Sequence, residues 1–420
     1  MIKKLQQIIY NLLKKSEKFF QTDMIYLAKG GFWLTLGQIV SSLSSFLLAI
    51  AFANLLPKET YGTYKYVLSL VGILSIFTLS GMNTSLTRSV ARGFEGSLKP
   101  ILKEKIKWGS IGSLVSLGIA AYYYLNGNLT LTICFVITAV FLPLMDPLGI
   151  YVSFLNGRKN FKLSTKYQAW SRVIATILMI LILIFTKNIF LILFTYFIFY
   201  TTCRFIFLKI TFKKQRPNSE KELGTISYGW HLSLIKVISL IANNLDKIVL
   251  WHLLGASSLA IYSMSTAAPN QIKSFLQKIY TLIFPKFSKQ KYIVLQKTIP
   301  KKAPIFSGFL IITIAIYILI CPYIFKIFFP RYLESINFSK IFILSFISMP
   351  GAFFINAFLA HNMKSEIYII RIGVPLFKII LIFILTPIYG ILGVILSYIM
   401  SGIFSLILSF ILFNRKSSSH

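Results

Sequence analysis

The feature that most constrains this sequence is a succession of long apolar stretches, each about 17–28 residues in length. A helix needs about 20 predominantly apolar residues to cross a hydrocarbon core of about 30 Å. The 420 residues are 56% hydrophobic and only 13% charged, with a mean hydropathy of +0.74. Successive spans leave little of the chain for a soluble domain. The sequence therefore predicts an all-α membrane protein.

We predict twelve transmembrane spans, with a basic amphipathic segment before them that lies on the membrane surface. The spans are residues 32–56, 64–86, 108–124, 130–154, 167–186, 190–210, 226–251, 258–285, 304–328, 337–361, 367–386 and 391–413. The amphipathic segment is 1–29, where Ile8 and Leu12 share one helical face and Lys4 and Lys15 lie on the other.

The distribution of basic residues fixes the orientation that we predict for these spans. With the N-terminus in the cytoplasm, the inside segments hold 29 Lys and Arg and the outside loops only three. The positive-inside rule therefore places both termini in the cytoplasm. The same rule accounts for the net charge of +33, so we expect no nucleic-acid partner.

A weak internal repeat divides the spans into two sets of six. Residues 55–64, at the end of the first span, resemble residues 253–262, at the end of the seventh, with an offset of 198 throughout. An even number of spans gives the two halves the same orientation, as in transporters built from parallel repeats. We therefore predict an N-lobe over 30–210, a cytoplasmic linker over 211–225, a C-lobe over 226–413 and a cytoplasmic tail over 414–420.

Several basic residues lie deep inside predicted spans, where a charge is costly unless it faces a cavity. Lys236, Lys273 and Lys378 are the deepest. Helical periodicity places polar residues beside them on spans seven, eight and eleven. The resulting stripes are Lys236, Asn243 and Lys247; Asn270, Lys273 and Gln277; and Arg371 and Lys378. For Arg172 and Arg371, snorkelling and cavity lining stay open, whereas Arg204 is near enough to a span end to snorkel to water.

Two carboxylates are also intramembrane, namely Asp146, between two prolines, and Asp246, beside Lys247. Each could couple transport to H⁺ or Na⁺, or could form a structural ion pair with a neighbouring cation. The basic residues outnumber these acids. The sequence therefore predicts a central cationic cavity whose ligand is an anion, such as phosphate.

Motifs for catalysis and for cofactors are missing from the sequence. It has no G-x-x-x-x-G-K-[ST] and no H-E-x-x-H, and its three cysteines and four histidines are scattered. We therefore expect no cofactor and no metal. The outer loops are too short for a catalytic domain, which favours a carrier over an enzyme.

Segments in both halves carry a resemblance to a known family. In the first half these are Lys29-Gly30-Gly31-Phe32-Trp33, Leu56-Pro57-Lys58-Glu59-Thr60-Tyr61-Gly62-Thr63-Tyr64 and Gly81-Met82-Asn83-Thr84-Ser85-Leu86-Thr87-Arg88. In the second half they are Asn244-Leu245-Asp246-Lys247, Leu254-Gly255 and Ala260-Ile261-Tyr262. The chain resembles polysaccharide-repeat flippases of the Wzx type, in the multidrug/oligosaccharidyl-lipid/polysaccharide exporter (MOP) superfamily.

This resemblance implies two six-helix lobes around a V-shaped cavity in the bacterial cytoplasmic membrane. It implies that the chain translocates undecaprenyl-diphosphate-linked oligosaccharide repeat units, for O-antigen, capsule or a similar surface glycan, by alternating access. Implied partners are this glycan lipid, membrane lipid, a glycan polymerase and chain-length machinery. Arg88, Asp246 and Lys247 carry over as cavity residues because they stand within the matching segments.

Three alternatives remain at this stage. A cation-coupled multidrug antiporter would need an acidic cavity rather than a basic one. A peptidoglycan lipid-precursor flippase typically has an additional C-terminal pair of spans, which we do not find in this sequence. A membrane glycan polymerase or ligase usually has a sizeable outer loop or a catalytic acidic motif.

Overall fold

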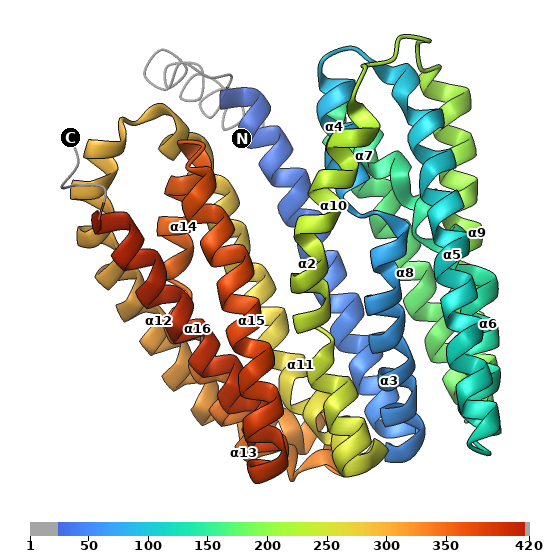
Figure 1. Ribbon diagram of the computed structural model, residues 1–420. Helices are drawn as coiled ribbons and strands as arrows, with labels where there is room; N and C mark the ends of the chain where they lie inside the picture. The colour runs from blue at the N-terminus through green and yellow to red at the C-terminus, as the bar shows by residue number, and fades with distance from the viewer. Residues whose placement is uncertain (1–23, 416–420) are drawn as a thin grey trace, which may run out of the picture.

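The computed structural model describes residues 24–415, which form helices and contain no strand (Figure 1). The first half comprises α2 (Met24–Leu55), α3 (Lys58–Leu74), η1 (Ser75–Thr78), α4 (Gly81–Ala91), η2 (Glu95–Ser97), α5 (Leu98–Leu125), α6 (Leu129–Met145), η3 (Pro147–Ile150), α7 (Tyr151–Gly157), α8 (Phe161–Phe185) and α9 (Ile189–Gln215). The predicted all-α fold is confirmed. Most of the predicted amphipathic segment, and the tail from residue 416, lie outside the described residues.

The second half follows a short connection and is also helical. It comprises α10 (Thr225–Ala242), α11 (Leu245–Lys289), α12 (Tyr292–Phe328), η4 (Pro330–Tyr332), α13 (Ser335–Phe342), η5 (Ile343–Ser348), α14 (Gly351–Ala360), α15 (Lys364–Tyr389) and α16 (Ile391–Arg415). The connection between α9 and α10 falls within the linker predicted at 211–225.

Eight helical segments of the described chain are long and apolar enough to cross a membrane. Two bent pairs, Lys58–Thr78 with Gly81–Ala91 and Ser335–Ser348 with Gly351–Ala360, raise this number to ten. One of the eight, Thr225–Gln277, contains Gly255, whose φ of 79° and ψ of 179° interrupt the helix. The chain is therefore a multi-pass membrane protein, and the count of twelve spans stays a prediction.

Several helices extend into segments that the sequence assigned to loops. α5 begins at Leu98 and α12 at Tyr292, although their spans were predicted to begin at 108 and 304. Residues 87–107, between the second and third predicted spans, are helical over 87–91 and again over 98–107, so a loop over the whole interval is wrong. Residues 98–107 belong to α5, and one of them, Lys105, is fully buried.

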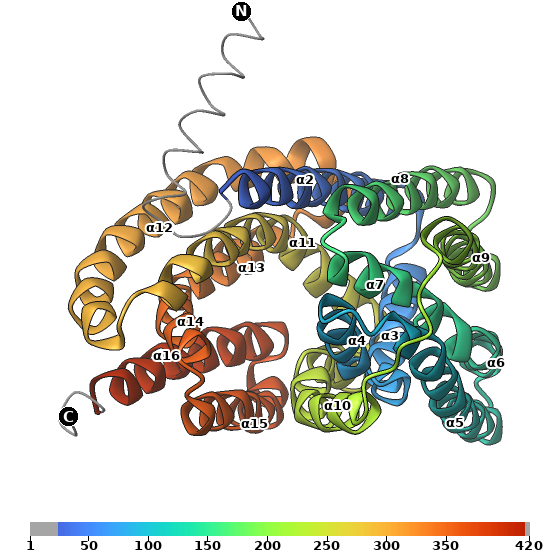
Figure 2. The same ribbon diagram turned by 90° about the horizontal axis from the view of Figure 1, so that it is seen from above.

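A close seam joins the two halves, where α10 and the first part of α11 run antiparallel along α3 and α4 (Figures 1 and 2). A Cβ on Gly81 would overlap the backbone nitrogen of Ser233, and a Cβ on Gly62 would overlap the carbonyl oxygen of Ala256. Small residues allow helix backbones to approach closely within a membrane. Both glycines belong to the segments that carry the family resemblance, so those segments build this seam.

The two segments of the predicted repeat meet at one end of the seam. The hydroxyl of Ser257 donates to Glu59 Oε1 at 2.6 Å, and these residues are 198 positions apart. Lys58 forms an ion pair with Glu334 nearby. In a protein built from two repeats related by a two-fold axis, equivalent residues of the two repeats can touch only close to that axis. This contact agrees with a parallel repeat, although the division into two six-span lobes stays a prediction.

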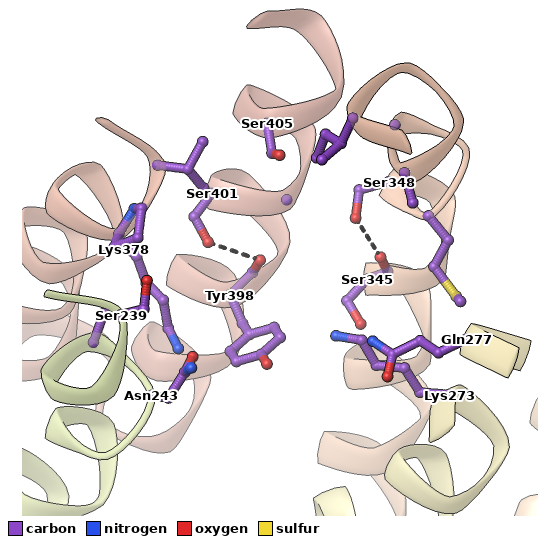
Figure 3. A pocket seen from close by; sticks show the side chains of 18 residues that line it. Ser239, Asn243, Lys273, Gln277, Ser345, Ser348, Lys378, Tyr398, Ser401 and Ser405 are labelled. Atoms are coloured by element: carbon purple, nitrogen blue, oxygen red, sulfur yellow. Dashed lines mark hydrogen bonds between the residues drawn. The ribbon is translucent and has the colours of Figure 1, made fainter. Parts of the chain in front are cut away.

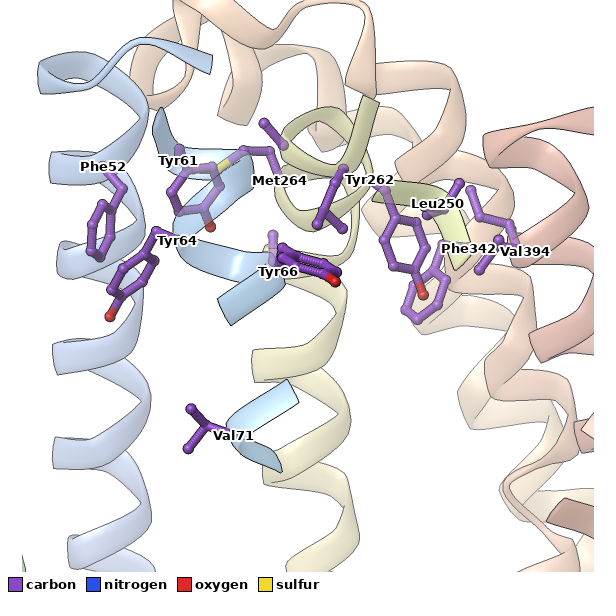
Figure 4. Packing of buried hydrophobic residues seen from close by; sticks show 14 of the residues in the cluster. Phe52, Tyr61, Tyr64, Tyr66, Val71, Leu250, Tyr262, Met264, Phe342 and Val394 are labelled. Atoms are coloured by element: carbon purple, nitrogen blue, oxygen red, sulfur yellow. The ribbon is translucent and has the colours of Figure 1, made fainter. Parts of the chain in front are cut away.

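Aromatic side chains pack this end of the seam (Figure 4). The ring of Tyr66 stacks on Trp251, with centroids 4.2 Å apart. Its hydroxyl pairs with the hydroxyl of Tyr123 and lies 3.2 Å from Nε2 of His252. These contacts link α3 and α5 in the first half to α11 in the second. The buried core is therefore continuous across the two halves.

The seam predicts that Gly62→Ala and Gly81→Ala each destabilise the protein. A methyl group at either position collides with backbone of the facing helix, and overpacking of this kind costs about 1–3 kcal/mol. Thermal unfolding in detergent measures the effect. Gly118→Ala on α5 is the matched control because a Cβ there meets nothing within 4 Å. Equal stability of all three variants would contradict the close seam.

Candidate functional site

The second half contains a pocket of about 320 Å³, which we call the C-terminal pocket (Figure 3). It lies among α10, α11, η5, α14, α15 and α16. Its main polar side chains are Ser239, Asn243, Lys273, Gln277, Lys378 and Tyr398. Four of these six, namely Asn243, Lys273, Gln277 and Lys378, are residues that the sequence predicted for a cavity.

Two lysines face the ring of Tyr398 in this pocket. Nζ of Lys378 lies 4.1 Å from the ring centroid, and Nζ of Lys273 lies 4.8 Å from it. Lys378 is only 6% exposed, and its ammonium has no hydrogen-bond partner among the described residues. A cation–π contact contributes about 2 kcal/mol when desolvated, which does not offset the several kcal/mol cost of burying an ammonium. An anion would complete this site.

Asp246 lies near the pocket but already has partners. Tyr262 donates its hydroxyl to Oδ2 at 2.7 Å, and Nζ of Lys247 is 3.6 Å from Oδ1. The aspartate is 3% exposed. Its charge is balanced within the protein by Lys247 and, through space, by Lys378.

The first half contains a second pocket, of about 460 Å³, which we call the N-terminal pocket. Its polar lining includes Gln38 and Ser41 of α2, Asp146, Gln168 and Arg172 of α8, and Arg204 of α9. Arg172 therefore faces a cavity, which resolves the ambiguity left by its sequence position. The interpretation of Arg204 as a snorkelling residue is wrong, because it lines this pocket and donates to the carbonyl oxygen of Met145 at 2.5 Å.

Asp146 is held by a cation that the sequence placed in a loop. Nζ of Lys105 lies 3.1 Å from Asp146 Oδ2 and donates to Asn83 Oδ1 at 2.8 Å. The hydroxyl of Thr78 donates to the same aspartate oxygen at 2.8 Å. Lys105 is fully buried, whereas 37% of the Asp146 side chain is exposed, on the side of the pocket. The ammonium occupies a position surrounded by oxygen atoms, as a bound cation would.

The remaining predicted cavity residues line neither pocket. They are Arg88, Lys236, Lys247, Asn270 and Arg371. The guanidinium of Arg88 lies 4.7 Å from the ring centroid of Tyr228, and Nζ of Lys236 is 3.5 Å from the carbonyl oxygen of Ser80. Arg371 and Asn270 are exposed. The structure thus brings Asp146 and Arg172 to the N-terminal pocket, and Asn243, Lys273, Gln277 and Lys378 to the C-terminal pocket. Lys236 and Arg371 lie close enough to each other to interact electrostatically.

The predicted stripe on span seven is wrong for a specific reason. α10 ends at Ala242 and α11 begins at Leu245, so the helix is interrupted between Lys236 and Lys247. A spacing of 100° per residue holds only along a continuous helix. Of the three stripe residues, only Asn243, at the interruption, lines the C-terminal pocket.

Sequence reasoning missed the contribution of α16 to the C-terminal pocket. Tyr398, Ser401 and Ser405 all line it, at spacings of three and four residues. This spacing is the signal that could have identified a polar helical face. For metal binding, residues 24–415 contain no group of three or more His, Cys, Asp and Glu side chains that could hold an ion.

Comparison with known proteins identifies the family. A family model described as "Polysaccharide biosynthesis protein" matches residues 27–291. An uncharacterised membrane protein of Methanocaldococcus jannaschii is 23% identical over 295 residues, which cover 62% of this chain and 58% of that protein. The chain therefore aligns with little more than half the length of this curated relative.

Solved transporter structures share the fold. A multidrug resistance MATE family transporter of the MOP superfamily matches in its inward-facing conformation with a TM-score of 0.63, at 10% identity, over 91% of this chain and 95% of that chain. A structure titled as the outward-facing conformation of a multidrug resistance MATE family transporter matches with a TM-score of 0.61, at 11% identity, over 93% of this chain and 96% of that chain. A MOP superfamily transporter from Pyrococcus furiosus, whose title describes a binding pocket of reverse polarity, matches with a TM-score of 0.59, at 12% identity, over 94% and 96%.

These likenesses agree with the helical architecture and confirm the resemblance seen in the sequence. The structural neighbours show the fold alone, because their identities to this chain are low. The family model covers well over half of the 420 residues. The chain accordingly belongs to the polysaccharide biosynthesis protein family.

Proposed function

We propose that this chain is a flippase that carries an undecaprenyl-diphosphate-linked oligosaccharide repeat unit across the cytoplasmic membrane by alternating access. The observation that carries the proposal is the buried ammonium of Lys378. It lies in the C-terminal pocket with Lys273 and has no hydrogen-bond partner among the described residues. Membership of a polysaccharide biosynthesis family supports a glycan-bearing cargo. The glycan would belong to O-antigen, capsule or a similar surface polymer.

The arrangement of the two lysines suits a diphosphate. In Figure 3 the ring of Tyr398 lies between Lys273 and Lys378, so two cations are held apart and cannot share one point charge. A diphosphate has negative oxygens on two adjacent phosphorus centres. Ionic hydrogen bonds from both lysines would satisfy the ammonium groups and the phosphates together.

The rest of the C-terminal pocket offers hydrogen-bonding groups suited to a sugar. Hydroxyls of Ser239, Ser401 and Ser405 and amides of Asn243 and Gln277 line it. Such groups both donate and accept, as sugar hydroxyls do. The prenyl tail would remain in lipid while this pocket holds the polar head.

The charge of the cargo also supplies a driving force. An inside-negative membrane potential favours outward movement of an anion by about 2.3 kcal/mol per charge per 100 mV. Asp146 and Asp246 already have the counter-ions Lys105 and Lys247. We therefore favour transport driven by the membrane potential over exchange of H⁺ or Na⁺ at these two acids.

The orientation of the chain in the membrane belongs to the same proposal. The excess of basic residues in alternate connections places both termini in the cytoplasm. In that orientation, the head group enters from the cytoplasmic leaflet, where the lipid-linked glycan is assembled.

A cation-coupled multidrug antiporter is the rival that the MATE-like fold favours. An organic cation would have to bind beside Lys273 and Lys378, where its charge is repelled. A peptidoglycan lipid-precursor flippase would carry the same diphosphate, so only the sugar separates it from our proposal. A membrane polymerase or ligase would act on the glycan without moving it.

We expect Lys273→Gln and Lys378→Gln each to weaken binding of undecaprenyl diphosphate by about ten- to hundredfold, because a hydrogen bond to a charged group contributes about 1.5–3 kcal/mol. Export of the surface glycan in cells should fall in parallel. Binding is measured by thermal stabilisation of the purified protein. Lys326→Gln is the matched control, since Lys326 is an exposed lysine of α12 that lines neither pocket.

Two results would contradict this assignment. Unchanged binding and export by both pocket variants would remove the C-terminal pocket from the transport path. Stabilisation by ethidium but not by undecaprenyl diphosphate would favour the multidrug antiporter.

The position of the Lys105 ammonium beside Asp146 allows a prediction of how the stability of the protein depends on sodium. Unfolding of the native protein should be the same in sodium and choline salts, because Lys105 fills the space beside Asp146. Lys105→Met leaves oxygen atoms of Asn83, Thr78 and Asp146 around a vacated position. This variant should be less stable in choline, by about 1–3 kcal/mol, because Asp146 loses a hydrogen-bonded counter-ion but stays 37% exposed and near Arg204. Sodium should partly restore its stability.

Lys105→Met combined with Asp146→Asn is the control, since it removes both charges and should lose the sodium response. Sodium-dependent stabilisation of the native protein that Asp146→Asn abolishes would show that Asp146 is a coupling site.

A further inference from the structure

A concave basic surface lies at the end of the molecule where α5 begins. Its volume is about 730 Å³, and it shares no lining residue with either pocket. We call it the linker groove, because one wall is the connection between α9 and α10. The lining residues that matter here are Glu95, Lys99, Lys103, Phe212, Arg216 and Lys221.

The carboxylate of the linker groove, Glu95, is already neutralised. Arg158 donates from Nε and Nη2 to its two oxygens, each at 2.5 Å, and the backbone N–H of Asn218 donates at 3.1 Å. Burial raises the pKa of Glu95, but the hydrogen bonds and charge of Arg158 outweigh it, so this pKa lies below its ordinary value. The carboxylate is therefore ionised and paired, and it cannot also balance the basic residues of the groove.

The four basic residues of the groove are exposed, and none forms an ion pair with a carboxylate in the described part of the chain. They are Lys99, Lys103, Arg216 and Lys221. Nearby acids are engaged elsewhere: Glu222 pairs with Arg92 at 2.8 Å, and Glu104 accepts from Trp108 Nε1 at 3.0 Å. Glu220 does not line the groove. Four cations thus surround one cavity, two from α5 and two from the connection between α9 and α10.

The groove is preformed by backbone contacts. Gly96 N–H donates to the carbonyl oxygen of Glu220 at 2.8 Å, and Asn218 Nδ2 donates to that of Gly93 at 2.7 Å. In Figure 1 this connection crosses the upper end of the first half. A ligand that binds here does not have to order the connection first, which reduces the entropic cost of binding.

The depth of the groove matches a lipid head group. Trp108 marks the start of the apolar part of α5, and Lys103 precedes it by five residues, or about 7.5 Å along the helix. The polar layer of a bilayer extends about 5–8 Å beyond the hydrocarbon on each side. The sequence predicts that the third span begins at residue 108, and this placement puts Lys103 at the level of phosphate groups. Pro100 and Phe212 are partly exposed apolar residues of the same groove.

We propose that the linker groove binds the phosphate head group of an anionic phospholipid from the adjoining leaflet, held by Lys99, Lys103, Arg216 and Lys221. A phosphodiester supplies the negative charge that Glu95 cannot, and its glycerol and acyl chains can follow the apolar surface. Basic pockets between helices on the cytoplasmic side of membrane proteins recognise such head groups. This site is independent of the transported cargo.

The test uses full-length protein in vesicles of phosphatidylcholine, with or without phosphatidylglycerol. We compare Lys99→Gln combined with Lys103→Gln against Lys213→Gln combined with Lys214→Gln. All four lysines are exposed near the same end of the molecule, but Lys213 and Lys214 do not line the groove. Retained phosphatidylglycerol is counted by native mass spectrometry, and unfolding temperature is measured in both vesicles.

The native protein and the Lys213/Lys214 variant should retain phosphatidylglycerol and unfold at a higher temperature in its presence. The Lys99/Lys103 variant should bind this lipid at least about tenfold more weakly, since each basic group contributes about 1 kcal/mol near an anionic surface. An equal loss of phosphatidylglycerol binding in both variants would show that the lipid is attracted by general surface charge and not by the linker groove. Stabilisation of the native protein by inorganic phosphate in phosphatidylcholine alone would show a site for free anions and overturn the lipid assignment. If the double variant unfolds in phosphatidylcholine, Lys103→Gln alone is compared with Lys213→Gln.

Discussion

An ammonium group enclosed by a helical bundle needs a negative partner, and this requirement organises both halves of the molecule. Lys105 meets it within the protein, through Asp146 and Asn83. Lys378 has no hydrogen-bond partner among the described residues: Asp246 attracts it only through space, and Tyr398 offers only a weak cation–π contact. The energetic cost of the second arrangement has to be offset when a ligand binds. The difference between these two lysines is the reason for assigning a ligand to the C-terminal pocket.

Interruptions of helices bring these charged groups to their places. Asp146 lies between α6 and η3, next to Pro147, and Asn243 lies between α10 and α11. At such breaks, backbone groups and short side chains turn toward a cavity instead of following the helical spiral. The glycine seam packs α10 and α11 closely against α3 and α4 on both sides of the break at Asn243.

The sequence was sufficient to predict the fold class and the family. It predicted some of the pocket residues correctly and missed or misplaced others. Hydropathy and the segments around Gly62 and Gly81 predicted the helical membrane protein and its family. Lys105 was missed because it follows a run of basic residues, and its partner Asp146 is 41 positions away. Lys236 and Lys247 were misplaced because periodicity assumes a continuous helix, and only the structure shows the break at Asn243. The pairing of distant residues and the continuity of a helix are properties of tertiary packing, which local patterns do not record.

The two halves have different chemistry at their pockets. The contact between Glu59 and Ser257, at the offset of the predicted repeat, agrees with a parallel relation between them. In the first half, Lys105 of α5 pairs with the carboxylate of Asp146. In the second half, Lys378 of α15 has no hydrogen-bond partner among the described residues, so its ammonium can bind a ligand. A carrier that exchanges a cation bound in the N-terminal pocket for cargo bound in the C-terminal pocket would need an unpaired carboxylate in the N-terminal pocket. Because Lys105 pairs with Asp146, that acid is not free, and the proposed cargo site rests on the lysine of the C-terminal pocket that lacks a hydrogen-bond partner.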